Sequence, residues 1–177
     1  MLTKRYVLKE NITGKEIPDF NTILDVTLTD SHLIFEFDCK NSQFYSAYDK
    51  YNAPIWEGDV CEAFICTNGN KNLYYEIEIA PNGTVFLKLM KYLGVGEIEE
   101  FDIDKNFVDW KIQLCGSDYK VKFSVPLDKI GYDKEKGILF NAFRIETEGG
   151  IQEKNLLALN PTMCDTFHNN EFFIELK

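Results

Sequence analysis

The sequence predicts an all-β protein, a single-domain antiparallel β-sandwich or jelly roll that spans residues 1–177. Apolar and polar residues alternate with a period of two along most of the chain, and turn-forming clusters recur roughly every 8–12 residues. No stretch shows the 3.6-residue apolar spacing of an amphipathic helix over ten or more residues. These observations favour one packed sandwich without repeats, linkers or a second domain.

The strands can be followed in chain order. In residues 32–39, apolar side chains share one face while Glu36 and Asp38 lie on the other, which is the pattern of a half-buried strand. Residues 23–28 precede it and end in the turn cluster 29–31, so the two segments form a hairpin. Similar strands are expected at residues 60–67, 72–80, 84–90, 110–115, 119–125, 138–146 and 171–176.

Other segments depart from this alternation. Pro126 starts one helical turn at residues 127–130. The acidic run at residues 97–104 is interpreted as an exposed strand, because it lacks the spacing of a calcium-binding loop. Two long irregular segments, residues 41–58 and 159–170, are where a binding site is expected, because long loops without secondary structure are often functional.

Composition excludes several classes of protein. The chain has 19 basic and 29 acidic residues, a net charge of −10 that would repel nucleic acid. No run approaches the roughly 20 apolar residues of a membrane-spanning helix. The N-terminal residues are charged where a signal peptide would be apolar, so a cytoplasmic location without membrane association is expected.

The cysteines indicate free thiols rather than disulfides or a zinc site. Their number is odd, none forms a C-x-x-C pair, and the chain has only two histidines. We therefore expect buried or incidental thiols, which behave as small hydrophobic residues. The cysteines are Cys39, Cys61, Cys66, Cys115 and Cys164.

Glu62 interrupts an apolar strand face. It shares its parity with Val60, Phe64 and Cys66, so its carboxylate should be costly to bury unless it is paired or contacts a ligand. Arg144, which breaks another apolar run, is a possible salt-bridge partner, and its planar guanidinium is equally suited to hydroxyl groups. Both roles remain open.

Three motifs occur in a defined order along the chain. A W-x-x-D-x-x-E-x-F-I run begins at Trp56, a Y-Y-E-I-E-I-x-P-x-G strand and turn follows at residues 74–83, and N-P-T at residues 160–162 precedes Phe167-His168. This combination resembles the family 9 carbohydrate-binding modules and their DOMON-like relatives, which are β-sandwiches. The resemblance covers most of residues 44–86 and 158–176.

The resemblance implies a non-catalytic module that binds a mono- or oligosaccharide between two aromatic side chains. Trp56 would be the first stacking platform, and Phe167 or His168 would stand opposite, where the family has a second Trp. Glu62, Arg144 and Asn160 would bind the sugar hydroxyls. No cofactor is implied beyond a possible structural calcium ion.

Aromatic side chains also have a structural interpretation. Trp56 follows Pro54 in an irregular segment, so stacking on a sugar and packing against the protein are equally open. Trp110 begins an alternating strand and is expected in the core. The sequence does not predict an oligomeric state.

Three other functions stay open. Glu76 and Glu78 face the same way and could serve an inverting glycosidase, although a solvated sheet face is the simpler interpretation. The aromatic segment could instead mediate self-association or bind a partner protein. His168 with Met90 or Met163 could ligate haem, as some DOMON-like relatives do.

Overall fold

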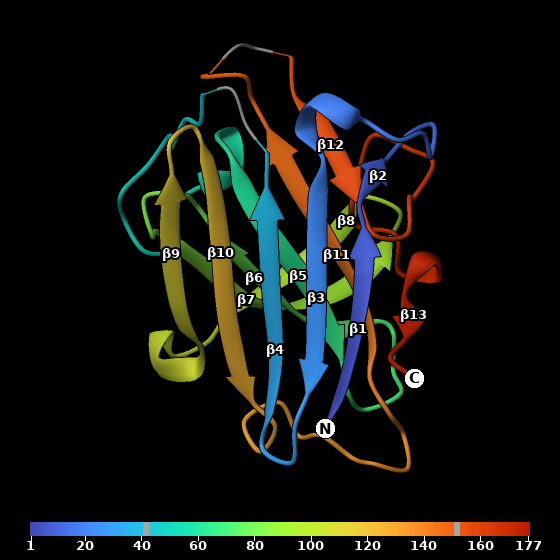
Figure 1. Ribbon diagram of the computed structural model, residues 1–177. Helices are drawn as coiled ribbons and strands as arrows, with labels where there is room; N and C mark the ends of the chain where they lie inside the picture. The colour runs from blue at the N-terminus through green and yellow to red at the C-terminus, as the bar shows by residue number, and fades with distance from the viewer. Residues whose placement is uncertain (41–42, 151–152) are drawn as a thin grey trace.

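Two antiparallel sheets packed face to face form the structure, a computed structural model that describes residues 1–40, 43–150 and 153–177 (Figure 1). The smaller sheet faces the viewer in Figure 1. Its strands, in spatial order, are β1 (Leu2–Val7), β3 (Thr22–Leu28), β4 (His32–Cys39), β10 (Asp118–Pro126) and β9 (Asp109–Cys115). The predicted hairpin is confirmed, because β3 and β4 pair along their whole length.

The larger sheet lies behind the smaller one in Figure 1. Its strands, in spatial order, are β2 (Lys9–Glu10), β12 (Asn155–Ala158), β11 (Leu139–Glu146), β5 (Val60–Cys66), β6 (Leu73–Ile79), β7 (Val85–Gly94) and β8 (Glu97–Asp102), with β13 (Ile174–Glu175) also paired to β11. Short 3-10 turns lie in the segments between strands, at η1 (Pro18–Phe20), η2 (Ile55–Glu57), η3 (Lys105–Phe107) and η4 (Asn170–Phe172). The described residues contain no α-helix, and the predicted all-β sandwich is confirmed.

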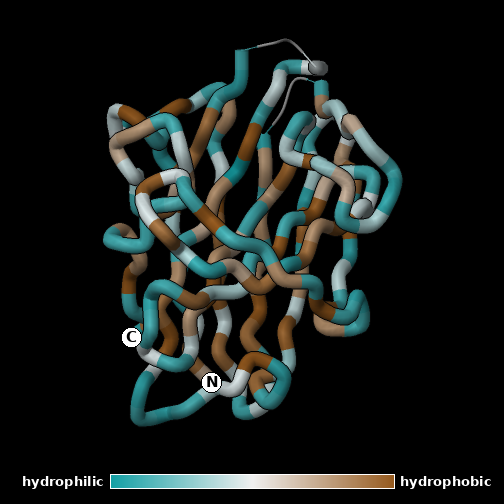
Figure 2. The backbone as a smooth tube through the Cα atoms, turned by 180° about the vertical axis from the view of Figure 1, so that it is seen from behind, coloured by the Kyte–Doolittle hydropathy of each residue, from teal (hydrophilic) through white to brown (hydrophobic). Residues whose placement is uncertain are grey.

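The central strands of the larger sheet, such as β5 and β11, are buried on both faces. Alternate residues of a strand point to opposite faces, so Ala63 and Ile65 of β5 pack between the sheets while Phe64 packs on the outer face. A second apolar cluster covers that outer face, to which Ile55 and Phe167 contribute from the long loops. Seen from behind, hydrophobic and hydrophilic residues alternate along the strands (Figure 2).

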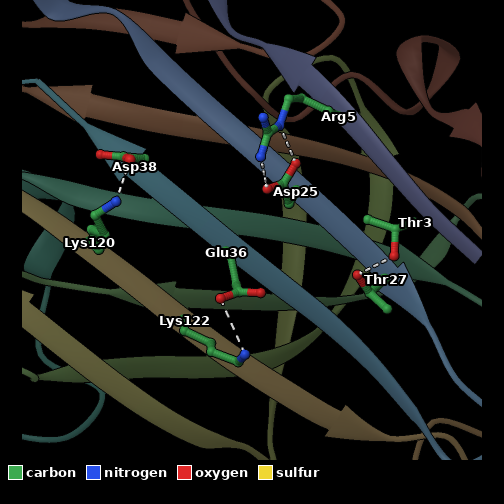
Figure 3. A network of polar contacts seen from close by, with 8 residues as sticks. All are labelled: Thr3, Arg5, Asp25, Thr27, Glu36, Asp38, Lys120 and Lys122. Atoms are coloured by element: carbon green, nitrogen blue, oxygen red, sulfur yellow. Dashed lines mark hydrogen bonds and ion pairs between the residues drawn. The ribbon is translucent and has the colours of Figure 1, made fainter.

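The outer face of the smaller sheet is polar and open to solvent. Directly opposed residues of neighbouring strands carry opposite charges or hydroxyl groups, as Figure 3 shows. The pairs are Arg5 with Asp25, Lys120 with Asp38, Lys122 with Glu36, and Thr3 with Thr27. The two outer faces therefore differ, since only that of the larger sheet is covered by loops.

Most predicted strands are present, with a few differences. The exposed strand predicted in the acidic run is β8, whereas β1, β2 and β12 are not among the predicted strands. Residues 171–176 form η4 and the short β13 rather than one strand, and residues 127–130 form hydrogen-bonded turns without a helix. All five cysteines are free thiols, as predicted, and Cys39, Cys61 and Cys66 are buried.

Trp110 was expected in the core, and that prediction is wrong. Its side chain is 42 % exposed on β9, an edge strand of the smaller sheet, and its indole N–H donates to the backbone carbonyl of Gly83 at 3.0 Å. The alternation predicts the strand correctly, but β9 is exposed at almost every position because it lies at the edge.

Candidate functional site

A pocket of about 330 Å³ lies on the outer face of the larger sheet, under the two long loops. This volume is at the lower end of the range of small-molecule sites, roughly 300–1,000 Å³. Strands β5, β6, β7, β8, β11 and β12 contribute to its floor, and the loops supply its rim. The pocket is lined by Trp56, Glu62, Glu76, Glu78, Phe86, Met90, Ile98, Glu100, Ile145, Leu156, Asp165, Thr166, Phe167 and His168.

Three glutamates meet on the pocket floor. The β5–β6 register places Glu62 opposite Glu78 and Phe64 opposite Glu76, so all these side chains point to the outer face. Glu62, Glu76 and Glu78 are 2–3 % exposed, and one carboxylate oxygen of each lies within 4.8 Å of the others. The prediction that Glu76 and Glu78 lie on a solvated face is therefore wrong, because the loops cover this face.

Burial raises the pKa of all three carboxyl groups. It raises the pKa of Glu76 to about 7. Burial and the charge of Glu76 raise the pKa of Glu62 well above its ordinary value, and burial with the charges of both neighbours does the same for Glu78. The charge of Lys154 opposes the rise in the pKa of Glu62, and a hydrogen bond with Glu78 opposes the rise in the pKa of Glu76, but burial is the largest cause at all three residues.

His168 forms one wall of the pocket as a neutral side chain. Its ring stacks on Phe64 with centroids 5.0 Å apart, and its Nδ1 lies 2.8 Å from the hydroxyl of Tyr74. Burial lowers the pKa of His168 to about 4. Its Nε2 is 3.8 Å from Oε2 of Glu76, which is too long for a hydrogen bond.

Trp56 forms the exposed aromatic edge of the pocket. It lies in η2 and is 37 % exposed, and its ring packs edge-to-face on Phe86 with centroids 5.0 Å apart. Phe167, from the other loop, is only 7 % exposed because it stacks on Phe143 at 4.2 Å. Of the two rings, only that of Trp56 offers a substantial free surface.

Buried polar contacts hold the loop that carries Trp56. The carboxylate of Asp59 accepts the backbone N–H of Tyr45 at 2.8 Å and the hydroxyl of Thr147 at 2.7 Å. Lys154 donates to the backbone carbonyl of Trp56 at 2.7 Å. Residues 41–42 of the predicted loop lie outside the described residues. The remainder of the loop is thus fixed against the end of β11 and the segment before β12.

The structure brings together four of the six residues predicted to bind a ligand. Trp56, Glu62, Phe167 and His168 all line the pocket. Arg144 and Asn160 do not. The backbone N–H of Asn160 donates to Oδ1 of Asn141 at 3.0 Å and its side chain donates to the carbonyl of Phe172 at 2.9 Å, so it holds the loop in place.

Arg144 lies between the two sheets. Its register partner on β5 is Cys61, whereas the partner of Glu62 is Phe143, so Arg144 and Glu62 point to opposite faces of the larger sheet. The predicted Glu62–Arg144 salt bridge is therefore wrong. The guanidinium instead donates to the hydroxyls of Thr22 at 2.8 Å and Tyr119 at 3.2 Å.

Several lining residues were not predicted as part of a binding site. Phe86, Ile98 and Glu100 come from β7 and β8, and Ile145 comes from β11. The sequence carries one signal for Glu76 and Glu78, their shared parity with Tyr74. It carries none for β8, because an exposed acidic strand gives no indication that it borders a pocket.

Structural comparison assigns the fold. No family model and no curated protein matches the sequence. A candidate carbohydrate-binding protein from Bacteroides uniformis superposes with a TM-score of 0.75 at 14% identity, covering 96% of this chain and 84% of that one. A family 9 carbohydrate-binding module from Caldicellulosiruptor kristjanssonii, in complex with cellotriose, has a TM-score of 0.68 at 13% identity over 99% of this chain and 82% of that one.

The chain has the family 9 carbohydrate-binding module fold. The module from Caldicellulosiruptor kristjanssonii in complex with glucose also matches, with a TM-score of 0.68 at 14% identity over 97% of this chain and 83% of that one. At 13–14% identity, what this chain shares with these proteins is their fold. Within the described residues, no helix is long and apolar enough to cross a membrane.

Proposed function

We propose that this protein binds carbohydrate without transforming it, and that the ligand occupies the pocket beside Trp56. The observation that carries the proposal is the pairing of an indole ring, 37 % exposed, with buried carboxylate oxygens that have no hydrogen-bond partner. A sugar ring has an apolar C–H face that suits an aromatic plane and hydroxyl groups that donate to carboxylates. The pocket offers both kinds of surface.

The roles of the lining residues follow from their positions. Trp56 is the stacking platform, and Glu62, Glu76 and Glu78 accept hydrogen bonds from hydroxyl groups. Phe167 and His168 close the opposite side of the pocket. Nδ1 of His168 is hydrogen-bonded to the Tyr74 hydroxyl, which leaves Nε2 to contact the ligand. The modules with the same fold that are in complex with cellotriose and glucose support carbohydrate as the class of ligand.

The arrangement of the carboxylates on one floor favours binding over hydrolysis. Glycosidases place their two carboxyl groups on either side of the scissile bond, roughly 6.5–9.5 Å apart in inverting enzymes and roughly 5–5.5 Å apart in retaining ones. Here one oxygen of each glutamate lies within 4.8 Å of the others, on one floor rather than across a cleft. We therefore expect no turnover of aryl glycosides by the purified protein.

Intrinsic tryptophan fluorescence tests the proposal. Wild type is titrated with glucose, cellotriose and a panel of other mono- and oligosaccharides, beside Trp56→Ala and the matched control Trp110→Phe. We expect a saturable change for at least one sugar in wild type and in Trp110→Phe, and its loss in Trp56→Ala. If no sugar gives a change while circular dichroism shows an intact fold, or if Trp110→Phe alone loses it, the proposal is wrong.

A further inference from the structure

We propose that Glu62, Glu76 and Glu78 form a binding site for a divalent cation on the pocket floor, with one carboxylate oxygen from each residue. This inference goes beyond the proposed function, because the cation needs no sugar in order to bind. Carboxylate oxygens are hard ligands that suit Ca²⁺, Mg²⁺ and Mn²⁺. The three residues come from two adjacent strands, so the sheet itself fixes their positions.

The spacing of the oxygens fits a shared cation. Bonds from Ca²⁺ to oxygen are about 2.3–2.6 Å long, so two oxygens on the same ion lie at most about 5 Å apart. The ligand oxygens of the three glutamates are all within 4.8 Å of one another. One Ca²⁺ ion can therefore bind all three carboxylates after small movements of their side chains.

The same carboxylates have unmet hydrogen-bonding capacity. Oε1 of Glu62, Oε2 of Glu76 and Oε2 of Glu78 are buried and have no hydrogen-bond partner. An unsatisfied buried polar atom is costly, and a buried charge without a counter-ion is more so. A cation among the three oxygens would satisfy them together.

The described chain supplies little positive charge to this floor. Among the described residues, the basic side chain within 4.0 Å of these carboxylates is that of His168, and its Nε2 is 3.8 Å from Oε2 of Glu76, too far for a hydrogen bond. The charge of Lys154 acts on Glu62, but its ammonium group donates its hydrogen bond to the backbone carbonyl of Trp56. Glu100 and Asp165, which also line the pocket, add negative charge that favours entry of a cation.

The bound cation would have coordination positions that the protein does not fill and that face the pocket. Three protein oxygens are fewer than the six to eight, roughly, that surround Ca²⁺ in proteins. Water would fill the remaining positions, and hydroxyl groups of a ligand could replace that water. The site lies at the bottom of a pocket that reaches solvent beside Trp56, so the ion has a route of entry.

Calorimetric titration of the full chain, freed of metal with a chelator, tests the inference without any sugar present. Ca²⁺, Mg²⁺ and Mn²⁺ are titrated separately into wild type, Glu78→Gln and the matched control Glu99→Gln. Glu99 lies on the neighbouring β8, exposed and paired with Lys91 at 2.9 Å. We expect one ion per chain for at least one of the metals and a loss of affinity of at least about tenfold in Glu78→Gln. Glu99→Gln should bind as wild type.

Two outcomes would overturn the inference. One is that none of the three metals binds wild type. The other is that Glu78→Gln, shown to be folded by circular dichroism, binds the metal as tightly as wild type does. Terbium luminescence in Trp110→Phe locates the ion, because Trp56 is then the sole indole that could sensitise it. Sugar titrations in chelator distinguish the two proposals, since carbohydrate binding could persist where cation binding fails.

Discussion

Arg144 illustrates how a single residue can be misassigned from its sequence context. It interrupts an apolar run of β11, which the sequence shows, but parity alone does not say which of two buried faces it joins. The structure places it in the core between the sheets, where it donates to Thr22 and Tyr119. Its Nη2 is buried without a hydrogen-bond partner.

Replacing Arg144 with Lys should lower stability and leave ligand binding unchanged. Lysine cannot reproduce the planar fork of donors that reaches both hydroxyls, so we expect the free energy of unfolding to fall by about 1–3 kcal/mol. Urea unfolding measures the loss, and the sugar and metal titrations measure binding. A loss of affinity in a folded Arg144→Lys variant would contradict the placement of Arg144 away from the site.

For Glu62, in contrast to Arg144, the sequence context indicated the environment correctly. Its position among Val60, Phe64 and Cys66 marked it as a carboxylate out of place, and the structure confirms that it is buried in the pocket floor. The sequence does not indicate that Glu76 and Glu78 are buried, because acidic residues that share one face of a strand are usually exposed to solvent. What the sequence does not show is that distant loops cover that face.

At the scale of elements, the strands could be predicted and the covering loops could not. Strands such as β4 and β10 follow from period-two alternation, since one face meets the core and the other meets water. β1 was missed because its burial alternates only weakly at the edge of the smaller sheet. The paths of the two long loops depend on tertiary packing.

The conformation of the loop that carries Trp56 depends on the absence of a side chain at Gly58. A Cβ at Gly58 would lie 2.6 Å from the carbonyl oxygen of Tyr45 and 2.9 Å from the backbone N of Ala47. Gly58→Ala should therefore displace η2, reduce sugar affinity and lower the free energy of unfolding by about 1–3 kcal/mol.

Gly94→Ala is the matched control for this variant. A Cβ at Gly94 would meet only the side chain of Glu97, at 3.6 Å, which is an ordinary contact. Thermal unfolding and sugar titration of both variants provide the comparison. If Gly58→Ala and Gly94→Ala had the same stability and the same sugar affinity, the close approach of Gly58 to the backbone of Tyr45 and Ala47 would not be required by the loop.

At the scale of the whole molecule, the two outer faces have different roles. The outer face of the smaller sheet is a lattice of exposed ion pairs, whereas that of the larger sheet carries a second apolar cluster and the pocket. The fold class was predictable, since it depends on period-two alternation. The assignment of the site to one outer face required the structure.

The polar face of the smaller sheet should contribute little to stability. The ion pair between Lys122 and Glu36, 3.2 Å apart, has both side chains about half exposed. Such pairs are weakened by solvent screening, so Lys122→Ala should change the free energy of unfolding by less than about 1 kcal/mol and leave sugar affinity unchanged. Urea unfolding at low and high salt checks this, and a loss of several kcal/mol would contradict it.

The most direct test of the central claim uses the two indole N–H signals in a ¹H–¹⁵N NMR spectrum. Trp56 borders the pocket on the larger sheet and Trp110 lies on the smaller sheet, so one reports on the site and the other is an internal control. Each signal is assigned with Trp56→Phe and Trp110→Phe, and the sugar panel is then added to wild type. The account predicts a saturable shift of the Trp56 indole with the Trp110 indole unmoved. A shift of Trp110 alone, or of neither indole with any sugar, would contradict it.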